Sequence, residues 1–197
     1  MAEIDRLHRA LLRPAGASSD FDLNPGLALA PDRVLRPAAV LLAIWPKPDG
    51  ARLILTKRAS HLKHHPGQIA FPGGKVDPGD ASAQAAALRE AYEEVGIAPG
   101  NVEVIGSLPS HETVTGFCIF PFLGLVRDDF MPIPEAGEVD EVFTVPLSHV
   151  LDPARFVIER RRWLGQWRHY YAVPYGPYYI WGATARILRG LADRAQS

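Results

Sequence analysis

The hydrophobic pattern along the chain predicts a sheet with several buried strands. Residues 38–45 (AAVLLAIW) are apolar throughout, which is typical of a strand buried on both faces. The turn-forming residues 46–50 follow, and residues 52–57 then alternate like a returning strand of a hairpin. Residues 118–126 form a second continuous apolar run, which predicts another buried strand. The dense aromatic residues between positions 160 and 175 favour a further pair of strands over the core.

Helical spacing of apolar residues predicts three helices outside these strands. One is expected over residues 1–12 and a last one from Tyr179 to about Ala195. The third lies between Ser82, a favoured N-cap residue, and Gly96, which stands where a C-terminal cap glycine belongs. Four apolar residues of this third helix share one face and are expected to point to the core, namely Leu88, Ala91, Tyr92 and Val95.

Three glutamates lie on the opposite face of that helix. Glu90, Glu93 and Glu94 are close together there, and Arg89 can reach Glu93 one turn further on. A solvated face is the ordinary interpretation of exposed glutamates. Two features favour a site instead: the preceding residues on this face are small, and an upstream double-glycine turn can bring the Gly74 carbonyl close. Carboxylate and carbonyl oxygens suit Mg²⁺ or Mn²⁺, and we expect Glu90, Glu93, Glu94 and Gly74 to bind one of these ions.

The stretch from residue 71 to residue 97 resembles the Nudix box. The second half of the box is present without a gap, as Arg89-Glu90, two residues, Glu93-Glu94, one residue, then Gly96-Ile97. The first half departs from the general pattern. The acid is Asp80 instead of glutamate, and the interval from Gly74 to Arg89 is one residue longer, which puts a catalytic role for Asp80 in doubt. Both departures are similar to the Nudix subgroup of coenzyme A pyrophosphatases.

A segment ahead of the box makes the resemblance to that subgroup more specific. Residues 55–74 (LTKRASHLKHHPGQIAFPGG) are similar to the extension found there, with Arg58, Leu62, His65, Gly67 and Gln68 at matching places. The segment is also rich in basic residues, among them Lys63. Such a segment is either a solvated loop or an anion-binding surface that offsets phosphate charge beside the glutamates. We expect four of its residues to bind substrate, namely Arg58, Lys63, His65 and Gln68.

Two further segments carry candidate residues. The polar residues 108–117 are expected to form a loop at the mouth of a strand, where His111, Glu112, Thr113 and Thr115 face either substrate or solvent. Thr115 is the substrate-binding candidate among them. The resemblance also implies a carboxylate outside the box that acts as general base or extra metal ligand. Glu138 lies in the matching part of the chain, and Asp140 and Glu141 are weaker candidates.

Length and composition limit the class of protein and the compartment. The chain has 197 residues and a net charge of −1, which gives no general attraction to nucleic acid or anionic membranes. A single cysteine fits a reducing compartment, and the N-terminus lacks a secretory signal pattern. No apolar run approaches the roughly 20 residues that cross a bilayer. We therefore expect a cytoplasmic protein in which residues 36–197 form the Nudix domain. Residues 1–35 add a helix and an arm that serves as linker, surface wrap or homodimer contact.

The resemblance implies an α/β/α sandwich with a mixed sheet between helices. It implies metal-dependent hydrolysis of a small molecule, coenzyme A or a derivative, to adenosine 3′,5′-bisphosphate and 4′-phosphopantetheine. The residues expected to carry the reaction are Glu93, Arg89 and Glu138. Two alternatives stay open: a Nudix hydrolase of another nucleoside diphosphate derivative such as ADP-ribose, and a non-catalytic module that senses a nucleotide.

Overall fold

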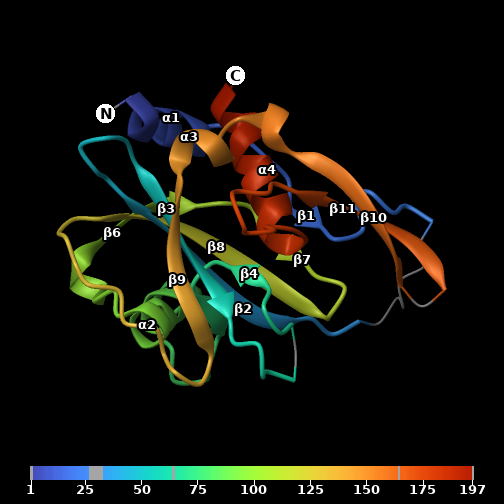
Figure 1. Ribbon diagram of the computed structural model, residues 1–197, viewed down its shortest axis with the longest axis horizontal. Helices are drawn as coiled ribbons and strands as arrows, with labels where there is room; N and C mark the ends of the chain where they lie inside the picture. Colours follow the sequence, from blue (N-terminus) through green and yellow to red (C-terminus); the bar gives the residue numbers. More distant parts are fainter. Residues whose placement is uncertain (1, 27–32, 64, 164, 197) are drawn as a thin grey trace.

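The computed structural model describes residues 2–26, 33–63, 65–163 and 165–196, and the side chain of Trp163 is not described (Figure 1). Short 3-10 turns occur at Pro99–Asn101 and Pro153–Arg155. The helices and strands follow one another as α1 (Ala2–Leu11), β1 (Ser18–Ser19), β2 (Arg36–Trp45), β3 (Arg52–Arg58), β4 (Ile69–Ala70), β5 (Gly73–Lys75), α2 (Ala83–Val95), β6 (Val102–Ser107), β7 (His111–Glu112), β8 (Phe117–Val126), β9 (Val139–Pro146), α3 (Leu147–Val150), β10 (Val157–Trp163), β11 (Gln166–Ala172) and α4 (Ala183–Gln196).

The large sheet is mixed, as the resemblance implied. Its main order is β1-β7-β8-β2-β3-β4, while β5 pairs with β2, β6 with β8 and β9 with β3. Strand β2 runs parallel to β8 and antiparallel to β3 and β5. The expected hairpin of β2 and β3 is confirmed, and so is the strand pair β10–β11, which forms a separate two-stranded sheet.

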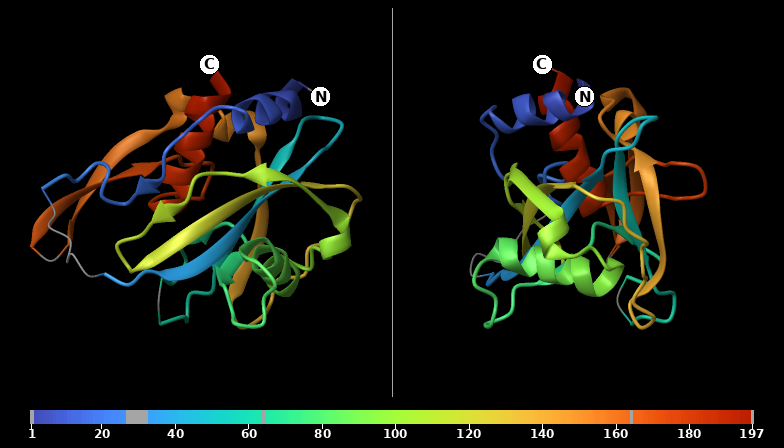
Figure 2. Two further views of the ribbon diagram at one scale, coloured as in Figure 1. Left: turned by 180° about the vertical axis from the view of Figure 1, so that it is seen from behind. Right: turned by 90° about the vertical axis from the view of Figure 1, so that its left-hand side faces the viewer.

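Helices cover both faces of the large sheet. Helix α2 lies on one face, and α1 and α4 lie on the other (Figure 2). Strand β2 shows why residues 38–45 are apolar throughout. Leu42 and Ile44 join the core under α1 and α4, whereas Leu41 and Ala43 join the core under α2, and all four are fully buried. A strand that is covered on both faces needs apolar residues at successive positions.

Two details of the expected helices are corrected. Helix α4 begins at Ala183 and not at Tyr179, because isolated bridges pair Tyr175 with Tyr178 and Ala172 with Trp181 and keep this segment extended. Tyr92 of α2 is 56% exposed and does not join the core with its predicted neighbours. No helix in the described part of the chain is both long and apolar enough to cross a membrane.

The described part of the N-terminal arm wraps around its own chain. Strand β1 pairs in parallel with β7, and the Asn24 side chain makes hydrogen bonds with both backbone groups of His169 on β11. Leu7 and Ala10 of α1 are fully buried in the core that contains α4. Of the three roles left open for the arm, these contacts correspond to a surface wrap; residues 27–32 of the expected arm lie outside the described residues.

Candidate active site on helix α2

The helix that carries the glutamates begins and ends where its capping residues predicted. Ser82 accepts a hydrogen bond from the backbone N–H of Ala85 at 3.1 Å. Gly96 has a φ of +82°, and its N–H donates to the carbonyl of Tyr92. Both caps satisfy backbone groups that have no partner within a helix. The side chains between these two ends therefore have a defined direction.

Glu94 is a carboxylate buried against the sheet. It is 4% exposed, and its Oε2 accepts a hydrogen bond of 3.1 Å from the backbone N–H of Gly73 at the start of β5. Burial raises the pKa of Glu94 to about 7, the hydrogen bond from Gly73 opposes this effect, and the charge of Glu90 adds to it. Burial also raises the pKa of Glu90, against the opposing charge of Arg89. The positive charges and hydrogen bonds around Glu90 and Glu94 therefore do not fully compensate for the burial of their carboxylates.

Two glycines make the close approach of β5 to α2 feasible. A Cβ at Gly74 would lie 2.4 Å from Oε1 of Glu90, so any side chain there would displace that carboxylate. Gly73 has a φ of +155°, and a Cβ there would lie 2.4 Å from the carbonyl oxygen of Ala39. Only glycine fits both positions without a shift of the backbone or of Glu90. The two glycines thus bring backbone next to the glutamates, as expected, but they belong to strand β5 and not to the predicted turn.

Arg89 holds the acidic residues around it in place. Its Nε and Nη2 donate to the two carboxylate oxygens of Asp80 at 2.9 and 3.0 Å. Its Nη1 donates to Glu90 at 3.0 Å and to Glu93 at 2.8 Å. These hydrogen bonds, that with Asp80 most of all, raise the pKa of Arg89, so it stays charged. The contact with Glu93 was predicted, whereas Asp80 proves to be the residue that anchors Arg89.

A pocket of about 510 Å³ opens over these residues. Its lining comes from the segment ahead of the box, from the box itself and from a second acidic segment. The lining residues are Leu62, Asp77, Arg89, Glu90, Glu93, Glu94, Glu135, Gly137 and Glu138. Glu138 lies near enough to Glu90 and Glu94 that its charge raises both of their pKa values. The structure therefore places the predicted Glu138 at the pocket. Glu135 was not predicted; its N–H donates to the carbonyl of Glu94 at 3.1 Å.

The donors at this pocket fit a hard divalent cation by their chemistry. Glu90 and Glu94 are one helical turn apart, carry raised pKa values, and supply only oxygen atoms. Among the described residues, no three acidic, histidine or cysteine side chains are arranged to hold a metal ion, and Arg89 occupies one oxygen each of Glu90 and Glu93. Glu90 and Glu94 are therefore the first candidates to hold such an ion, with Glu93 and the Gly74 carbonyl beside them.

The basic loop, residues 59–67, joins β3 to β4 beside this pocket; His64 in it lies outside the described residues. Leu62 lines the pocket, and the charge of Arg58 at the base of the loop lowers the pKa of Glu94. Lys63 and His65 are exposed. Gln68 lies behind the loop, where its Nε2 is 3.7 Å from the position of a Cβ on Gly182. Among the predicted substrate-binding residues, Arg58 therefore lies close enough for its charge to act on Glu94.

The loop before β8 differs from its prediction. Thr115 lies outside the pocket lining, in a turn where its hydroxyl pairs with that of Thr113 at 3.0 Å. His111 faces neither substrate nor solvent, because it is fully buried. Its Nδ1 is 2.9 Å from the Ser18 hydroxyl, and its Nε2 is 3.4 Å from Asp20. Asp20 in turn pairs with Arg168 at 2.8 Å.

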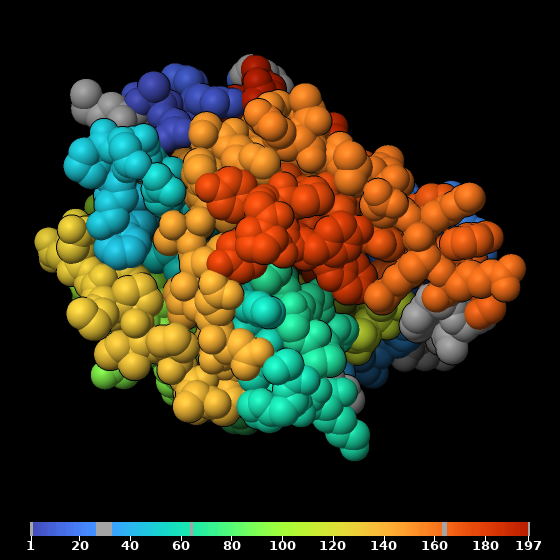
Figure 3. Space-filling model, in the orientation of Figure 1, coloured from blue at the N-terminus to red at the C-terminus, as the bar shows by residue number. Residues whose placement is uncertain are grey.

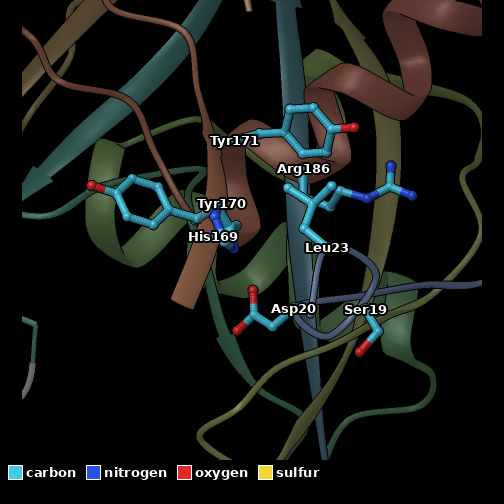
Figure 4. A pocket seen from close by; sticks show the side chains of 8 residues that line it. Ser19, Asp20, Leu23, His169, Tyr170, Tyr171 and Arg186 are labelled. Carbon is cyan, nitrogen blue, oxygen red and sulfur yellow. The ribbon is translucent and has the colours of Figure 1, made fainter. Parts of the chain in front are cut away.

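A second, much smaller hollow lies next to these buried charges. It measures about 10 Å³ and is lined by residues of the arm, of β11 and of α4 (Figure 4). Figure 4 shows the side chains of Asp20, His169 and Arg186 among those that line the hollow. A hollow of this size holds about one water molecule. The pocket on α2 is thus the one of these two that can accommodate a nucleotide.

Comparisons with known proteins point to one family. A family model described as NUDIX domain matches residues 35–166. Proteins named uncharacterized Nudix hydrolase NudL, from Enterobacter sp. (strain 638) and Salmonella paratyphi B, are each 46% identical over 165 residues. These matches cover 80% of this chain and 81% of each relative. A MutT/nudix family protein from Enterococcus faecalis has a similar fold, with a TM-score of 0.51 and 17% identity; the match covers 86% of this chain and 65% of that one.

Proposed function

This chain belongs to the Nudix family, and from that premise we propose that it is a metal-dependent hydrolase of coenzyme A or its derivatives. The reaction would cleave the phosphoanhydride to adenosine 3′,5′-bisphosphate and 4′-phosphopantetheine. The family supports hydrolysis of a pyrophosphate bond in a nucleotide derivative. The choice of coenzyme A is the finer part of the proposal, and it depends on the segment ahead of the box.

One observation supports the proposal most directly: the basic loop and the glutamates border the same pocket. Leu62 of the loop lines the pocket together with Glu90 and Glu94, and the charge of Arg58 acts on Glu94. A substrate with several phosphates needs positive charge where it meets acidic residues, because carboxylates alone repel it. The sequence segment similar to the coenzyme A subgroup is therefore also the segment placed to offset phosphate charge.

The proposal assigns distinct roles to the glutamates of α2 and to Arg89. Glu90 and Glu94 would hold Mg²⁺ or Mn²⁺, with Glu93 and the Gly74 carbonyl as further ligands. Such an ion neutralises phosphate oxygens and lowers the pKa of a bound water. Arg89, anchored by Asp80, keeps Glu93 in place.

Glu138 completes the reaction as the proposed general base. A water oxygen forms a bond to one phosphorus while the bridging P–O bond breaks, and the Glu138 carboxylate accepts the proton of that water. Its position at the pocket, near Glu90 and Glu94, supports this assignment.

A product assay tests the proposed activity. The purified protein is incubated with coenzyme A, ADP-ribose and diadenosine polyphosphates, each with Mg²⁺, Mn²⁺ or EDTA, and the products are identified by mass. We expect metal-dependent release of 4′-phosphopantetheine from coenzyme A, well ahead of the other substrates. Turnover of ADP-ribose alone would retain the metal site and reject coenzyme A. An absence of turnover with metal still bound would favour a nucleotide-sensing module.

The role of Lys63 in recognition is tested by a pair of substrates. Coenzyme A carries a 3′-phosphate that dephospho-coenzyme A lacks, and Lys63 is an exposed cation of the basic loop. We expect Lys63→Ala to lower kcat/KM on coenzyme A about 5-fold and to leave dephospho-coenzyme A nearly unaffected. Lys47→Ala, which removes a cation that is paired with Asp129 outside the pocket lining, is the matched control. Equal kcat/KM on the two substrates, in wild type and in Lys63→Ala, would exclude this role.

A further inference from the structure

The strand that brings Glu138 to the pocket contains a bulge immediately afterwards. In the pairing of β3 with β9, Lys57 lies opposite Glu141, but the next residue, Arg58, lies opposite Val139. Asp140 is therefore an extra residue with no partner of its own on β3. A bulge of this kind turns a side chain away from its regular direction along the strand.

The side chain of Asp140 contacts the basic loop. Its Oδ2 accepts a hydrogen bond of 2.9 Å from the backbone N–H of Ser60. The adjacent N–H of Ala59 donates to the carbonyl of Glu138 at 2.8 Å. Figure 3 shows the loop, in teal, against the lower end of β9, in orange. The first turn of the loop is thus attached at two points to the segment that also carries the Glu138 side chain.

The other end of the loop is closed by its own backbone. The N–H of Gly67 donates to the carbonyl of Arg58 at 3.1 Å, and the N–H of Arg58 donates to the carbonyl of Gln68 at 3.0 Å. These bonds fix the base of the loop. The first turn, which includes Ser60, is closed separately by the N–H of Leu62, which donates to the carbonyl of Ala59 at 3.2 Å, and neither set of bonds attaches this turn to β9. In the described part of the chain, the side chain that reaches a backbone group of this first turn is that of Asp140.

We propose that Asp140 is a positioning residue, whose carboxylate fixes the first turn of the basic loop beside the pocket and thereby determines how tightly substrate phosphates bind. The inference rests on the proposed function, because it takes the phosphates to lie between loop and glutamates. Asp140 touches neither substrate nor metal in this account. Its negative charge would by itself repel phosphate, so its benefit to binding comes from the hydrogen bond.

Two variants separate the hydrogen bond from the charge. Asp140→Asn keeps an oxygen that can accept from Ser60 and removes the charge, whereas Asp140→Ala removes both. We expect Asp140→Ala to raise KM about 5- to 10-fold with kcat changed less than about 2-fold, as loss of one ordering hydrogen bond implies. Asp140→Asn is expected to restore a KM close to that of wild type. The matched control is Asp152→Ala, because Asp152 makes an equivalent 3.0 Å bond to the N–H of Ala154 away from the pocket.

Hydrogen–deuterium exchange of residues 58–68 gives a readout that needs no activity. We expect faster exchange of the first turn in Asp140→Ala and wild-type exchange in Asp140→Asn. Equal KM values for Asp140→Ala and wild type, or equal effects of the two Asp140 variants, would overturn the proposal. KM is measured on whichever nucleotide derivative the wild type hydrolyses. Failure of the wild type to hydrolyse coenzyme A therefore counts against the proposed function alone, and KM together with exchange still decides the role of Asp140.

Discussion

Two groups of buried charge in this protein are built in opposite ways. In the arm, Asp20 is 10% exposed and lies against His111 and Arg168, which are 0% and 8% exposed. In the pocket, Glu94 is 4% exposed, and its charged neighbours are Glu90, Glu138 and a single cation, Arg58, among the charges that act on it most. Burial by itself raises the pKa of Asp20, but the His111 ring 3.4 Å away and the charge of Arg168 outweigh it, so this pKa lies below its ordinary value. The pKa of Glu94 rises instead to about 7.

The difference separates a structural group from a functional one. A buried carboxylate with cationic and hydrogen-bonding partners stabilises the fold, and removal of one member leaves the others uncompensated. A buried carboxylate among other carboxylates destabilises the fold unless a cation joins it, which is typical of sites that bind metal or move protons. Asp20, His111 and Arg168 therefore attach the arm to the strands beside it, whereas the positive charges of Arg58 and Arg89 offset the burial of Glu94 and Glu90 only in part.

Among the substitutions that test this comparison, Glu94→Gln is expected to have the largest effect. Glu94→Gln keeps the size of the side chain and its hydrogen bond from Gly73 but removes the charge. We expect kcat to fall about 10²- to 10³-fold, while Tm stays equal to that of wild type or rises, because a costly buried charge is lost. Steady-state kinetics and calorimetry measure the two values. Glu103→Gln, at an exposed position on β6, should change neither, and wild-type turnover by Glu94→Gln in saturating Mg²⁺ would contradict the assignment.

The opposite result, a loss of stability with activity retained, is expected for the arm network of Asp20, His111 and Arg168. Asp20→Asn removes the buried carboxylate that pairs with Arg168, so the free energy of unfolding should fall by about 3 kcal/mol. Turnover per folded molecule should be unchanged, because Asp20 does not line the pocket. Urea unfolding gives the first value, and an activity assay at low temperature gives the second. Asp193→Asn, which breaks an exposed pair with Arg189, is the control and should cost about 0.5 kcal/mol or less.

Arg89 tests whether geometry or charge alone organises the pocket. Its guanidinium meets both oxygens of Asp80 and also reaches Glu90 and Glu93, which a lysine ammonium cannot do at once. We expect Arg89→Lys to lower kcat about 10-fold with little change in KM. Arg127→Lys, in an exposed pair with Glu103 on β6, serves as the matched control. Unchanged kcat in Arg89→Lys would mean that a positive charge alone, without the planar guanidinium, is sufficient to organise the pocket.

The smallest expected effect is the pH dependence of the stability that Asp20 contributes. The folded-state pKa of Asp20 is depressed, so its contribution to stability is present above the ordinary value of 3.8 and is lost as pH falls through the folded pKa. The difference in unfolding free energy between wild type and Asp20→Asn should therefore narrow below about pH 3.8, by about 1.4 kcal/mol per unit of pKa shift. Unfolding curves recorded between neutral and acid pH measure it. A difference that stays constant to low pH would show that Asp20 does not titrate as the network requires.

The predictions that succeeded depend on local periodicity. The caps Ser82 and Gly96 and the contact of Arg89 with Glu93 follow from the helical repeat, and the β2–β3 hairpin follows from alternation beside a turn. The resemblance to the Nudix box supplied the mixed sheet and directed attention to Glu138. The caps, the contact of Arg89 with Glu93 and the hairpin can be read from short stretches because the residues involved are neighbours both in sequence and in space.

The features that sequence reasoning missed join residues that are far apart in the chain. His111 was expected in a loop that faces substrate or solvent, but pairing of β7 with β1 buries it beside Ser18 and Asp20. Asp140 was considered only as a weaker candidate for the general base or an extra metal ligand, since a bulge in β9 leaves no mark in the sequence. Glu135, three residues before Glu138, could have been suspected from the acidic run alone.

A Mn²⁺ titration tests the central claim most directly, because it asks whether the unbalanced carboxylates of α2 are completed by a cation. Binding is followed by calorimetry in wild type, Glu94→Gln and Asp20→Asn, all confirmed to be folded. We predict saturable Mn²⁺ binding in wild type, binding at least about 10-fold weaker in Glu94→Gln, and wild-type affinity in Asp20→Asn. Equal affinity in wild type and Glu94→Gln would contradict the account and place the metal, if bound, elsewhere.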